Sequence, residues 1–254
     1  LKWAWVAALV MPVGAAADSL SCASPDPGRG SIGLVLSGGG ARGAAHVGVL
    51  KVLEEMRVPV DCIAATSFGA IVGGLYSSGM PVAQIEKTLA EIDWSAVFDD
   101  RLDRDNRPYR RKWDDDLWLV KGRGGVRDGE LRFPTGLIQG QKIRGILSRF
   151  TMPVAGVRDF DQLPIPFRAV ATDIVSGEEA VLGGGVLADA IHASMAIPAI
   201  FAPVEIDGRL LVDGGVSNNL PVTVARAMGA EIIIAVDIST QLYQREQLDS
   251  LLAI

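Results

Sequence analysis

Two short segments of the chain carry residue types suited to acyl-transfer chemistry. Gly38-Gly39-Gly40-Ala41-Arg42-Gly43 follows the apolar run Ile32–Ser37, and Ala65-Thr66-Ser67-Phe68-Gly69 closes the next apolar run. A glycine-rich turn after a strand presents backbone N–H donors to a developing oxyanion. A serine on a sharp strand-to-helix turn presents its oxygen as a nucleophile. Together the two segments predict a hydrolase that forms a covalent serine intermediate.

The glycine-rich turn taken alone also fits a dinucleotide-binding fold. Gly38, Gly40 and Gly43 match the pattern G-x-G-x-x-G, which needs an acidic residue at the end of the second strand to hold a ribose. Asp61 stands at the start of that strand instead, and Ser67 occupies its functional end. The sequence therefore favours acyl transfer over nucleotide binding, and we predict neither a cofactor nor a metal ion.

The serine turn departs from the usual G-x-S-x-G at one position. Ala65 stands where the first glycine is expected, whereas Gly69 supplies the last one. Strand and helix pack closely around such a turn, and alanine is the smallest side chain after glycine, so the substitution weakens the motif without breaking it. The alternative is that Ser67 only caps the following helix.

A serine nucleophile needs a base, and the two histidines of the chain are poorly placed to supply one. His46 falls in the helical pattern after the glycine turn and His192 in the helical run Ala188–Met195, whereas a triad histidine follows a late strand. An aspartate serves if its pocket is desolvated enough to raise its proton affinity. Asp213 follows an apolar run and enters the turn Gly214-Gly215, although Asp-Gly-Gly alone is an ordinary turn sequence. We therefore predict Asp213 as the base.

Strand and helix patterns alternate along the chain. Apolar runs predict strands over Ile32–Leu36, Val60–Thr66, Phe167–Ala171 and Glu231–Ile238. Helical spacing predicts helices over Ala44–Met56, Ala70–Ser78, Pro81–Ile92, Thr135–Phe150 and Pro221–Met228. Solidly apolar strands that alternate with helices indicate an α/β fold whose mainly parallel sheet is covered on both faces.

Composition limits the class of protein. The 254 residues are 49% hydrophobic and 21% charged, which suits one sizeable domain with a full core. A formal net charge of −6 argues against a nucleic-acid partner, which would require a basic face. After the N-terminal segment, no apolar run reaches the roughly 18 residues that a membrane-spanning helix needs. Apolar loops of an acidic enzyme can still contact a bilayer.

The N-terminus reads as a targeting segment. Lys2 precedes the apolar stretch Trp3–Val13, and Ala15-Ala16-Ala17 fits a small-residue cleavage site. We predict a signal peptide over residues 1–17 and a leader over residues 18–30, and hence an exported protein that is secreted or associated with the outer membrane. The alternative is a buried N-terminal helix.

Two cysteines offer one conceivable disulfide bond. An oxidising compartment would allow Cys22 and Cys62 to pair. Cys62 falls inside a predicted core strand, however, and Cys22 in a polar leader rich in proline and glycine. We therefore expect two free thiols.

Regular patterning fades between Ser95 and Pro134. Trp113 and Trp118 lie there among dense charges. One interpretation is a solvated surface excursion with both indoles folded back on the core. The other is a lid or a membrane-touching insertion, because tryptophans beside cations suit a lipid–water boundary.

Taken in order, Gly38–Gly43, Ala65–Gly69 and Asp213–Gly215 resemble the motifs of the patatin-like phospholipase family. The runs His192–Pro198 and Asn218–Pro221 resemble that family too. The resemblance spans roughly residues 32–239, and we assign residues 31–239 to a patatin-like hydrolase domain. It implies a three-layer α/β/α fold and the hydrolysis of carboxylic esters in lipids by a Ser–Asp dyad.

The resemblance also implies roles for individual residues. Ser67 would be the nucleophile and Asp213 the general base. Backbone N–H groups around Gly39 and Gly40 would form the oxyanion hole, and Arg42 would brace that loop or meet a lipid phosphate. The substrate is then a lipid or phospholipid, reached by transient contact with a membrane surface.

A signal peptide before such a domain resembles a secreted subgroup of the family, in which the domain is the passenger of an outer-membrane β-barrel. Residues 240–254 would then be a linker or a truncated tail that leads to the barrel.

Two alternatives to a lipid acyl hydrolase stay open. One is a thioesterase or esterase that acts on soluble acyl esters, and the other is a weakly catalytic lipid-binding passenger.

Overall fold

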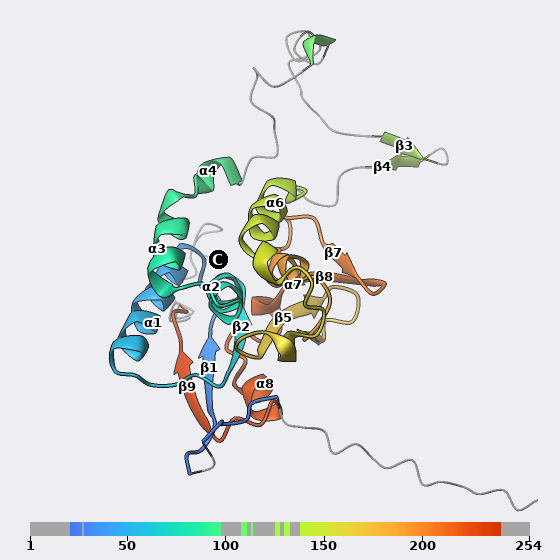
Figure 1. Ribbon diagram of the computed structural model, residues 1–254. Coiled ribbons are helices and arrows are strands. Elements are labelled where there is room, and N and C mark those ends of the chain that lie inside the picture. Colours follow the sequence, from blue (N-terminus) through green and yellow to red (C-terminus); the bar gives the residue numbers. More distant parts are fainter. Residues whose placement is uncertain are drawn as a thin grey trace, which may run out of the picture.

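The computed structural model describes residues 21–26, 28–97, 108–110, 113, 125–127, 130–132 and 138–239. They form a seven-stranded sheet with helices packed on both of its faces, and a separate two-stranded pair (Figure 1). The α/β class and the three-layer arrangement expected from the sequence are confirmed. The predicted signal peptide (1–17) and tail (240–254) lie outside the described residues.

The strands of the main sheet follow the order β7-β8-β5-β2-β1-β9, and β6 also pairs with β5. Their bounds are β1 Ile32–Leu36, β2 Cys62–Thr66, β5 Phe167–Asp173, β6 Glu179–Leu182, β7 Val204–Ile206, β8 Arg209–Asp213 and β9 Ile232–Val236. The pairs among β9, β1, β2 and β5 are parallel, whereas β5–β6, β5–β8 and β7–β8 are antiparallel. The antiparallel side did not emerge from the sequence because its strands are short and partly exposed.

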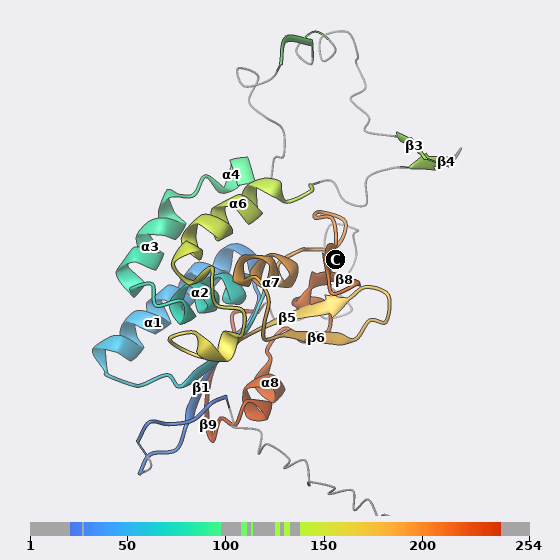
Figure 2. The ribbon, with the colours of Figure 1, turned by 45° about the vertical axis from the view of Figure 1, so that its right-hand side comes forward.

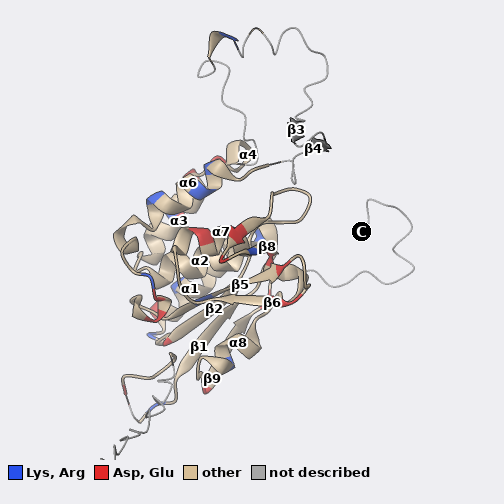
Figure 3. Cartoon of the chain, turned by 90° about the vertical axis from the view of Figure 1, so that its right-hand side faces the viewer, with Lys and Arg blue, Asp and Glu red and all other residues tan. Residues whose placement is uncertain are grey.

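Helices cover the sheet unequally. Their bounds are α1 Ala45–Glu55, α2 Phe68–Ser77, α3 Val82–Glu91, α4 Trp94–Val97, α6 Gln141–Phe150, α7 Leu187–Ser194 and α8 Val222–Ala227. Short 3₁₀ helices are η1 Gly40–Ala44, η3 Met152–Val154, η4 Phe160–Gln162 and η5 Gly214–Val216, and the separate pair is β3 Gly125–Arg127 with β4 Glu130–Arg132. The helices α1, α2, α3, α6 and α7 lie over one face and α8 over the other (Figures 2 and 3).

Most predicted elements lie within two residues of the observed bounds, and one helix does not. The helix expected over Thr135–Phe150 begins at Gln141. Gly140 before it adopts the left-handed conformation with φ 74°, and Ile138 forms a parallel bridge with Phe201. The extended bridge and the left-handed residue are both incompatible with a helix that starts earlier.

The central strands β1 and β2 are buried on both faces of the sheet. In β1, Leu34 and Leu36 pack into the large helical layer, whereas Val35 packs toward α8. In β2, Ile63 and Ala65 face the large layer and Cys62 faces α8. Successive side chains of a strand point to opposite faces, so a strand covered twice must be apolar at every position.

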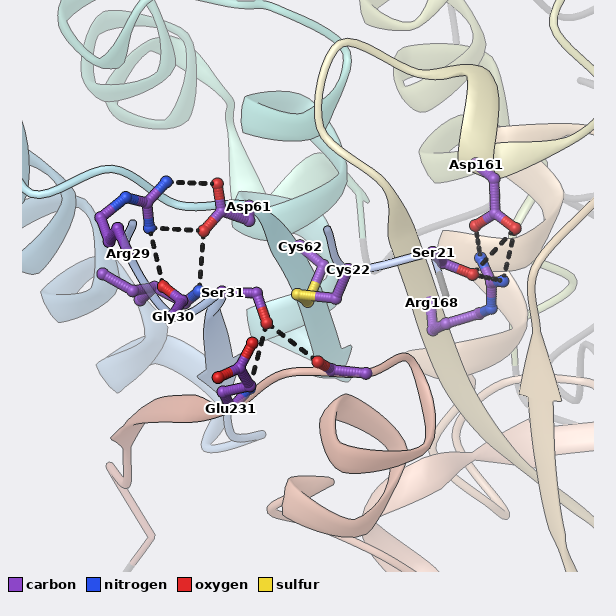
Figure 4. The surroundings of a disulfide bond; sticks show 12 residues. Ser21, Cys22, Arg29, Gly30, Ser31, Asp61, Cys62, Asp161, Arg168 and Glu231 are labelled. Carbon is purple, nitrogen blue, oxygen red and sulfur yellow. Dashed lines mark hydrogen bonds and ion pairs between the residues drawn. A yellow bond between two sulfur atoms is a disulfide. The ribbon is translucent and has the colours of Figure 1, made fainter. Parts of the chain in front are cut away.

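The expectation of two free thiols is wrong. Cys22 and Cys62 form a disulfide bond, with their Cα atoms 5.0 Å apart (Figure 4). Cys62 lies on the α8 face of the sheet, because side chains alternate along β2 and those of Ile63 and Ala65 point to the other face. The backbone N–H of Cys22 donates to the carbonyl of Met228 at 2.8 Å, and its side chain is 1% exposed. The part of the polar leader around Cys22 is therefore packed on the domain.

Polar contacts hold the same N-terminal segment on either side of the disulfide (Figure 4). The guanidinium of Arg29 donates two hydrogen bonds to Asp61, at 2.7 and 2.8 Å, and Asp61 also accepts from the N–H of Ile32. The Arg29 contact holds the pKa of Asp61 below its usual value. Ser21 donates to Asp161, which also pairs with Arg168. Asp61 thus anchors the N-terminal segment, which accounts for an acidic residue at the start of β2.

Removal of the disulfide is expected to destabilise the fold without altering the chemistry. The bond joins residues 40 positions apart. Replacing Cys22 and Cys62 together by alanine should lower the free energy of unfolding by about 3–4 kcal/mol, because the unfolded chain loses a closed loop. Urea denaturation of the oxidised protein and of the variant measures the difference. Equal midpoints would show that the segment is held by its polar contacts alone.

Candidate active site

Ser67 and Asp213 meet because β2 and β8 share one edge of β5. β2 runs parallel to β5 and pairs with Phe167–Val170, whereas β8 runs antiparallel and pairs with Ala171–Asp173. The strand β6 occupies the other edge of β5. β2 and β8 therefore run toward each other, and the residues at their carboxyl ends come into contact. The sheet itself brings the predicted serine and the predicted aspartate together.

The serine lies on a strained turn. Its hydroxyl donates a hydrogen bond of 2.6 Å to Oδ2 of Asp213. Ser67 has φ 53° and ψ −123°, in a region that costs a non-glycine residue on the order of 1–3 kcal/mol. Glycine is required two residues later, at Gly69, since a Cβ there would lie 2.5 Å from the carbonyl oxygen of Leu36. Ala65 is fully buried in β2, so the turn forms with alanine in place of the first glycine of G-x-S-x-G.

Ser194 supports the strained turn and was not among the predicted site residues. Its hydroxyl accepts the backbone N–H of Ser67 at 2.9 Å and donates to the carbonyl of Val170 at 2.5 Å. One side chain thereby satisfies a buried donor at the serine and a buried acceptor in β5. The only signal in the sequence was that Ser194 falls in the run His192–Pro198, which carried part of the family resemblance.

Burial raises the pKa of the Asp213 carboxyl above its ordinary value. The hydrogen bonds from Ser67 and from the N–H of Gly215 act in the opposite direction because they favour the charged form. Asp213 is 7% exposed. Gly214 allows close packing behind it, since a Cβ there would lie 2.1 Å from the carbonyl oxygen of Val170. The carboxyl is thus fixed in place and poised to accept a proton.

The glycine-rich turn packs against the serine turn and the loop after Asp213. Gly38 exchanges backbone and side-chain hydrogen bonds with Asn219, at 3.2 and 3.3 Å. A Cβ on Gly43 would collide with the ring of Phe68, and a Cβ on Gly39 would lie 2.8 Å from Ile238. Gly40 has φ 57°, which favours glycine. Within the described chain, the N–H groups of Gly39 and Gly40 donate no hydrogen bond, so both are free to bind an anion.

A cavity of about 590 Å³ opens at Ser67. Its described lining comes from η1, the helices α1 to α4 and the segment after α7, and includes Gly40, Ala41, Ala44, Val47, Phe68, Ile71, Leu89, Trp94, Met195 and Phe201. Apart from Ser67, the polar side chain among the lining residues is Glu86, which pairs with Lys51 at 2.6 Å. The space beside the serine therefore suits an apolar chain.

Neither histidine contacts the dyad within the described residues. His46 is fully buried, and its Nε2–H donates to the carbonyl of Ser37 at 2.8 Å. Burial lowers the pKa of the His46 ring, and the hydrogen bond to Ser37 opposes this shift. His192 packs edge-on against Phe201, with ring centroids 6.3 Å apart. Both rings therefore have structural partners away from the dyad.

The remaining predicted residues lie in the glycine-rich turn or in the segment between residues 95 and 134. Ala41 and Arg42 lie in η1 and are exposed. Trp113 is 58% exposed, so its indole is not folded into the core, and Trp118 lies outside the described residues. No cluster of three or more metal-ligating side chains occurs among the described residues, and none of their helices is long and apolar enough to cross a bilayer.

The motifs around this site are those of a known family. A sequence model of the patatin-like phospholipases matches residues 34–226, from β1 to α8. The chain belongs to the patatin-like phospholipase family. The matched range contains the glycine-rich turn, the serine turn and Asp213, so the family assignment covers the whole site.

Relatives within the family are longer than this chain. The chain is 32% identical over 231 residues to an uncharacterized NTE family protein of Mycobacterium tuberculosis, an alignment that covers 90% of this chain and 53% of the relative. It is 34% identical over 215 residues to patatin-like phospholipase domain-containing protein 7 of Rattus norvegicus, covering 83% of this chain and 14% of that protein. It thus spans about half of the first relative and a small part of the second.

Among solved structures, the fold is similar to that of VipD from Legionella pneumophila. The TM-score is 0.48 at 19% sequence identity, and the match covers 76% of this chain and 48% of that chain.

Proposed function

We propose that this protein is a lipid acyl hydrolase that cleaves carboxylic esters through a Ser67–Asp213 dyad. The observation that carries the proposal is the 2.6 Å hydrogen bond from Ser67 to a buried carboxyl at the mouth of an apolar cavity. A structural capping serine would need neither the carboxylate partner nor the cavity. The family assignment supports the same reaction.

In the first half of the reaction, Ser67 attacks the ester. Asp213 accepts the hydroxyl proton as the Ser67 oxygen forms a bond to the carbonyl carbon. The carbonyl oxygen becomes an oxyanion, which the free N–H groups of Gly39 and Gly40 stabilise. The tetrahedral intermediate then collapses, the bond to the alcohol oxygen breaks, and Asp213 returns its proton to the departing alcohol. The acyl group remains on Ser67.

In the second half, water takes the place of the alcohol. Asp213 accepts a proton from the water as its oxygen attacks the acyl carbon, and a second oxyanion forms at the same N–H groups. Collapse of this intermediate releases the fatty acid and returns the proton to Ser67. No metal or cofactor takes part in either half.

The cavity supports an acyl chain as the substrate group. The lining of apolar side chains next to Ser67 gives an alkyl chain a surface to bury and offers a polar head group few partners there. The substrate would therefore place its acyl chain in the cavity and its alcohol part toward solvent, near η1, which lines the cavity and contains the exposed Arg42. Such a substrate resides in lipid, so the enzyme contacts a membrane surface transiently.

A comparison of substrates tests the proposal. Rates on long-chain phospholipids in vesicles and on a short-chain soluble ester, each with release of fatty acid measured by mass spectrometry, separate the candidate activities. We expect preference for the lipid. Preference for a monomeric thioester or short ester would favour a soluble-ester hydrolase. Absence of turnover together with vesicle binding would favour a lipid-binding passenger.

We further propose that the protein is exported to an oxidising compartment. A buried disulfide between Cys22 and Cys62 supports this location, as does the signal-peptide pattern over residues 1–17. Fusion to an outer-membrane barrel is part of the same proposal and concerns residues beyond the described chain. Fractionation of cells that express the natural gene, with a cytoplasmic marker as control, tests the location.

The oxyanion donors give a prediction of their own. Gly39→Val should lower kcat by roughly 10²–10³-fold, about 3 kcal/mol, because the β-branched side chain meets Ile238 and displaces the turn. Gly145→Ala is the matched control, since a Cβ there meets no atom within 4 Å. The loss should fall on kcat more than on KM. Equal kcat in folded Gly39→Val and wild type would show that another group binds the oxyanion.

A further inference from the structure

Four consecutive apolar residues, Ile197-Pro198-Ala199-Ile200, are exposed between α7 and β7. They lie in the stretch Met195–Val204, which contains no polar or charged side chain. Ile197 is 38% and Ile200 is 37% exposed, whereas Phe201 is buried. Single exposed apolar side chains are ordinary, but an exposed run of this length on a folded domain indicates an interaction surface.

Backbone contacts hold this loop in its exposed position. The carbonyl of Ile200 accepts from the N–H of Ile138, and Ala202 donates to the carbonyl of Ile138, both at 2.8 Å. At the other end, the carbonyl of Ala196 accepts from the N–H of Asp213 at 2.9 Å. Ala199 has φ 68°, a left-handed conformation that is rare for a residue other than glycine. A loop without these anchors would relax and bury its isoleucines. The hydrogen bonds at both ends therefore maintain the strained backbone and the exposure of the isoleucines.

The loop also borders the site. Ile197 and Phe201 line the same cavity as Ser67. Its exposed face is therefore continuous with the apolar lining of the cavity, and its first anchor is the backbone of Asp213.

We propose that the loop Ile197–Ile200 inserts into the apolar part of a lipid bilayer and docks the cavity mouth on it. An acyl chain that leaves the bilayer would then pass the apolar side chains of Ile197 and Phe201 before it reaches Ser67. The net charge of −6 gives no general attraction to an anionic surface, so binding comes from apolar insertion. The substrate role of the bilayer rests on the proposed function, whereas docking itself is measurable without turnover.

The experiment measures binding of the Ser67→Ala protein to phosphatidylcholine vesicles by flotation, at low and high salt. Ile200→Glu in this background should weaken binding roughly tenfold, because a charge replaces an inserting apolar side chain. Ile200→Trp should tighten binding several-fold, since tryptophan favours the lipid–water boundary. Met56→Glu is the matched control: Met56 is 68% exposed and caps the end of α1 that lies away from η1.

The same substitutions are then placed in the active protein. Ile200→Glu should lower the rate on vesicles and leave the rate on a short soluble ester unchanged, and salt should have little effect on vesicle binding.

The proposal is overturned if Ser67→Ala protein does not bind phosphatidylcholine vesicles, if binding requires anionic lipid at low salt, or if Met56→Glu weakens it equally. Equal loss on both substrates would also overturn it, because the loop would then be part of the packing. A chain inactive on every ester but able to bind vesicles through Ile200 would instead contradict the proposed function alone.

Discussion

Replacement of Ser67 by alanine is expected to abolish ester hydrolysis, with a loss on the order of 10⁴-fold or more in kcat. Labelling by a fluorophosphonate should disappear as well, because that reagent needs the nucleophilic oxygen. The fold should persist. The substitution removes one oxygen from a residue that is 8% exposed, and the free energy of unfolding should change by about 1 kcal/mol, the scale of a single hydrogen bond.

The matched control is Ser77→Ala. Ser77 lies at the end of α2, is fully buried, and its hydroxyl has no hydrogen-bond partner within the described residues. Ser77→Ala removes the same atom at the opposite end of α2 without touching Asp213, so activity and labelling should be retained. Labelling of another serine in folded Ser67→Ala protein would refute the assignment of the nucleophile.

The local parts of the site were predictable because each depends on a few neighbouring residues. A serine in a turn between an apolar strand and a helix needs a small residue two positions later. Gly69 meets that need, since a Cβ there would lie 2.5 Å from the carbonyl oxygen of Leu36. Asp213 was predictable because it ends an apolar run before two glycines. Its distance from Ser67 was not, because the contact depends on the antiparallel pairing of β8 with β5. Short, half-exposed strands leave no such pattern in a sequence.

The residues that sequence reasoning missed act over long separations. Ser194 binds the N–H of a residue 127 positions away, and the side chain of Asn219 donates to a carbonyl 181 positions away. Serine and asparagine occur at many surface positions, so neither type marks its role. Cys22 is similar: its pairing with Cys62 follows from the packing of the leader against α8, which no local pattern encodes.

Asp213→Asn is expected to be nearly inactive, with a loss of several orders of magnitude in kcat. The amide preserves the size of the side chain but cannot accept the proton of Ser67. His46→Gln combined with His192→Gln is the contrasting variant and should retain most of the activity, since neither ring contacts the dyad. His46→Gln keeps an N–H donor for the carbonyl of Ser37. A triad enzyme would show the reverse, with the histidine change costing orders of magnitude.

The raised pKa of Asp213 adds a pH dependence with a defined sign. The base works only when ionised, so kcat/KM of the wild type should fall as the pH drops through a value above the ordinary pKa of about 3.9 for aspartate. The contribution of Asp213 to the free energy of unfolding changes with pH in the opposite direction. A carboxyl whose pKa is higher in the folded than in the unfolded state stabilises the fold below the unfolded pKa, and this contribution is lost as the pH rises through the folded pKa. At neutral pH, Asp213→Asn should therefore be at least as stable as the wild type, with the comparison made by urea denaturation across the pH range. A folded variant lacking either histidine that loses all activity, or an Asp213→Asn protein that keeps it, would show that Asp213 is not the base.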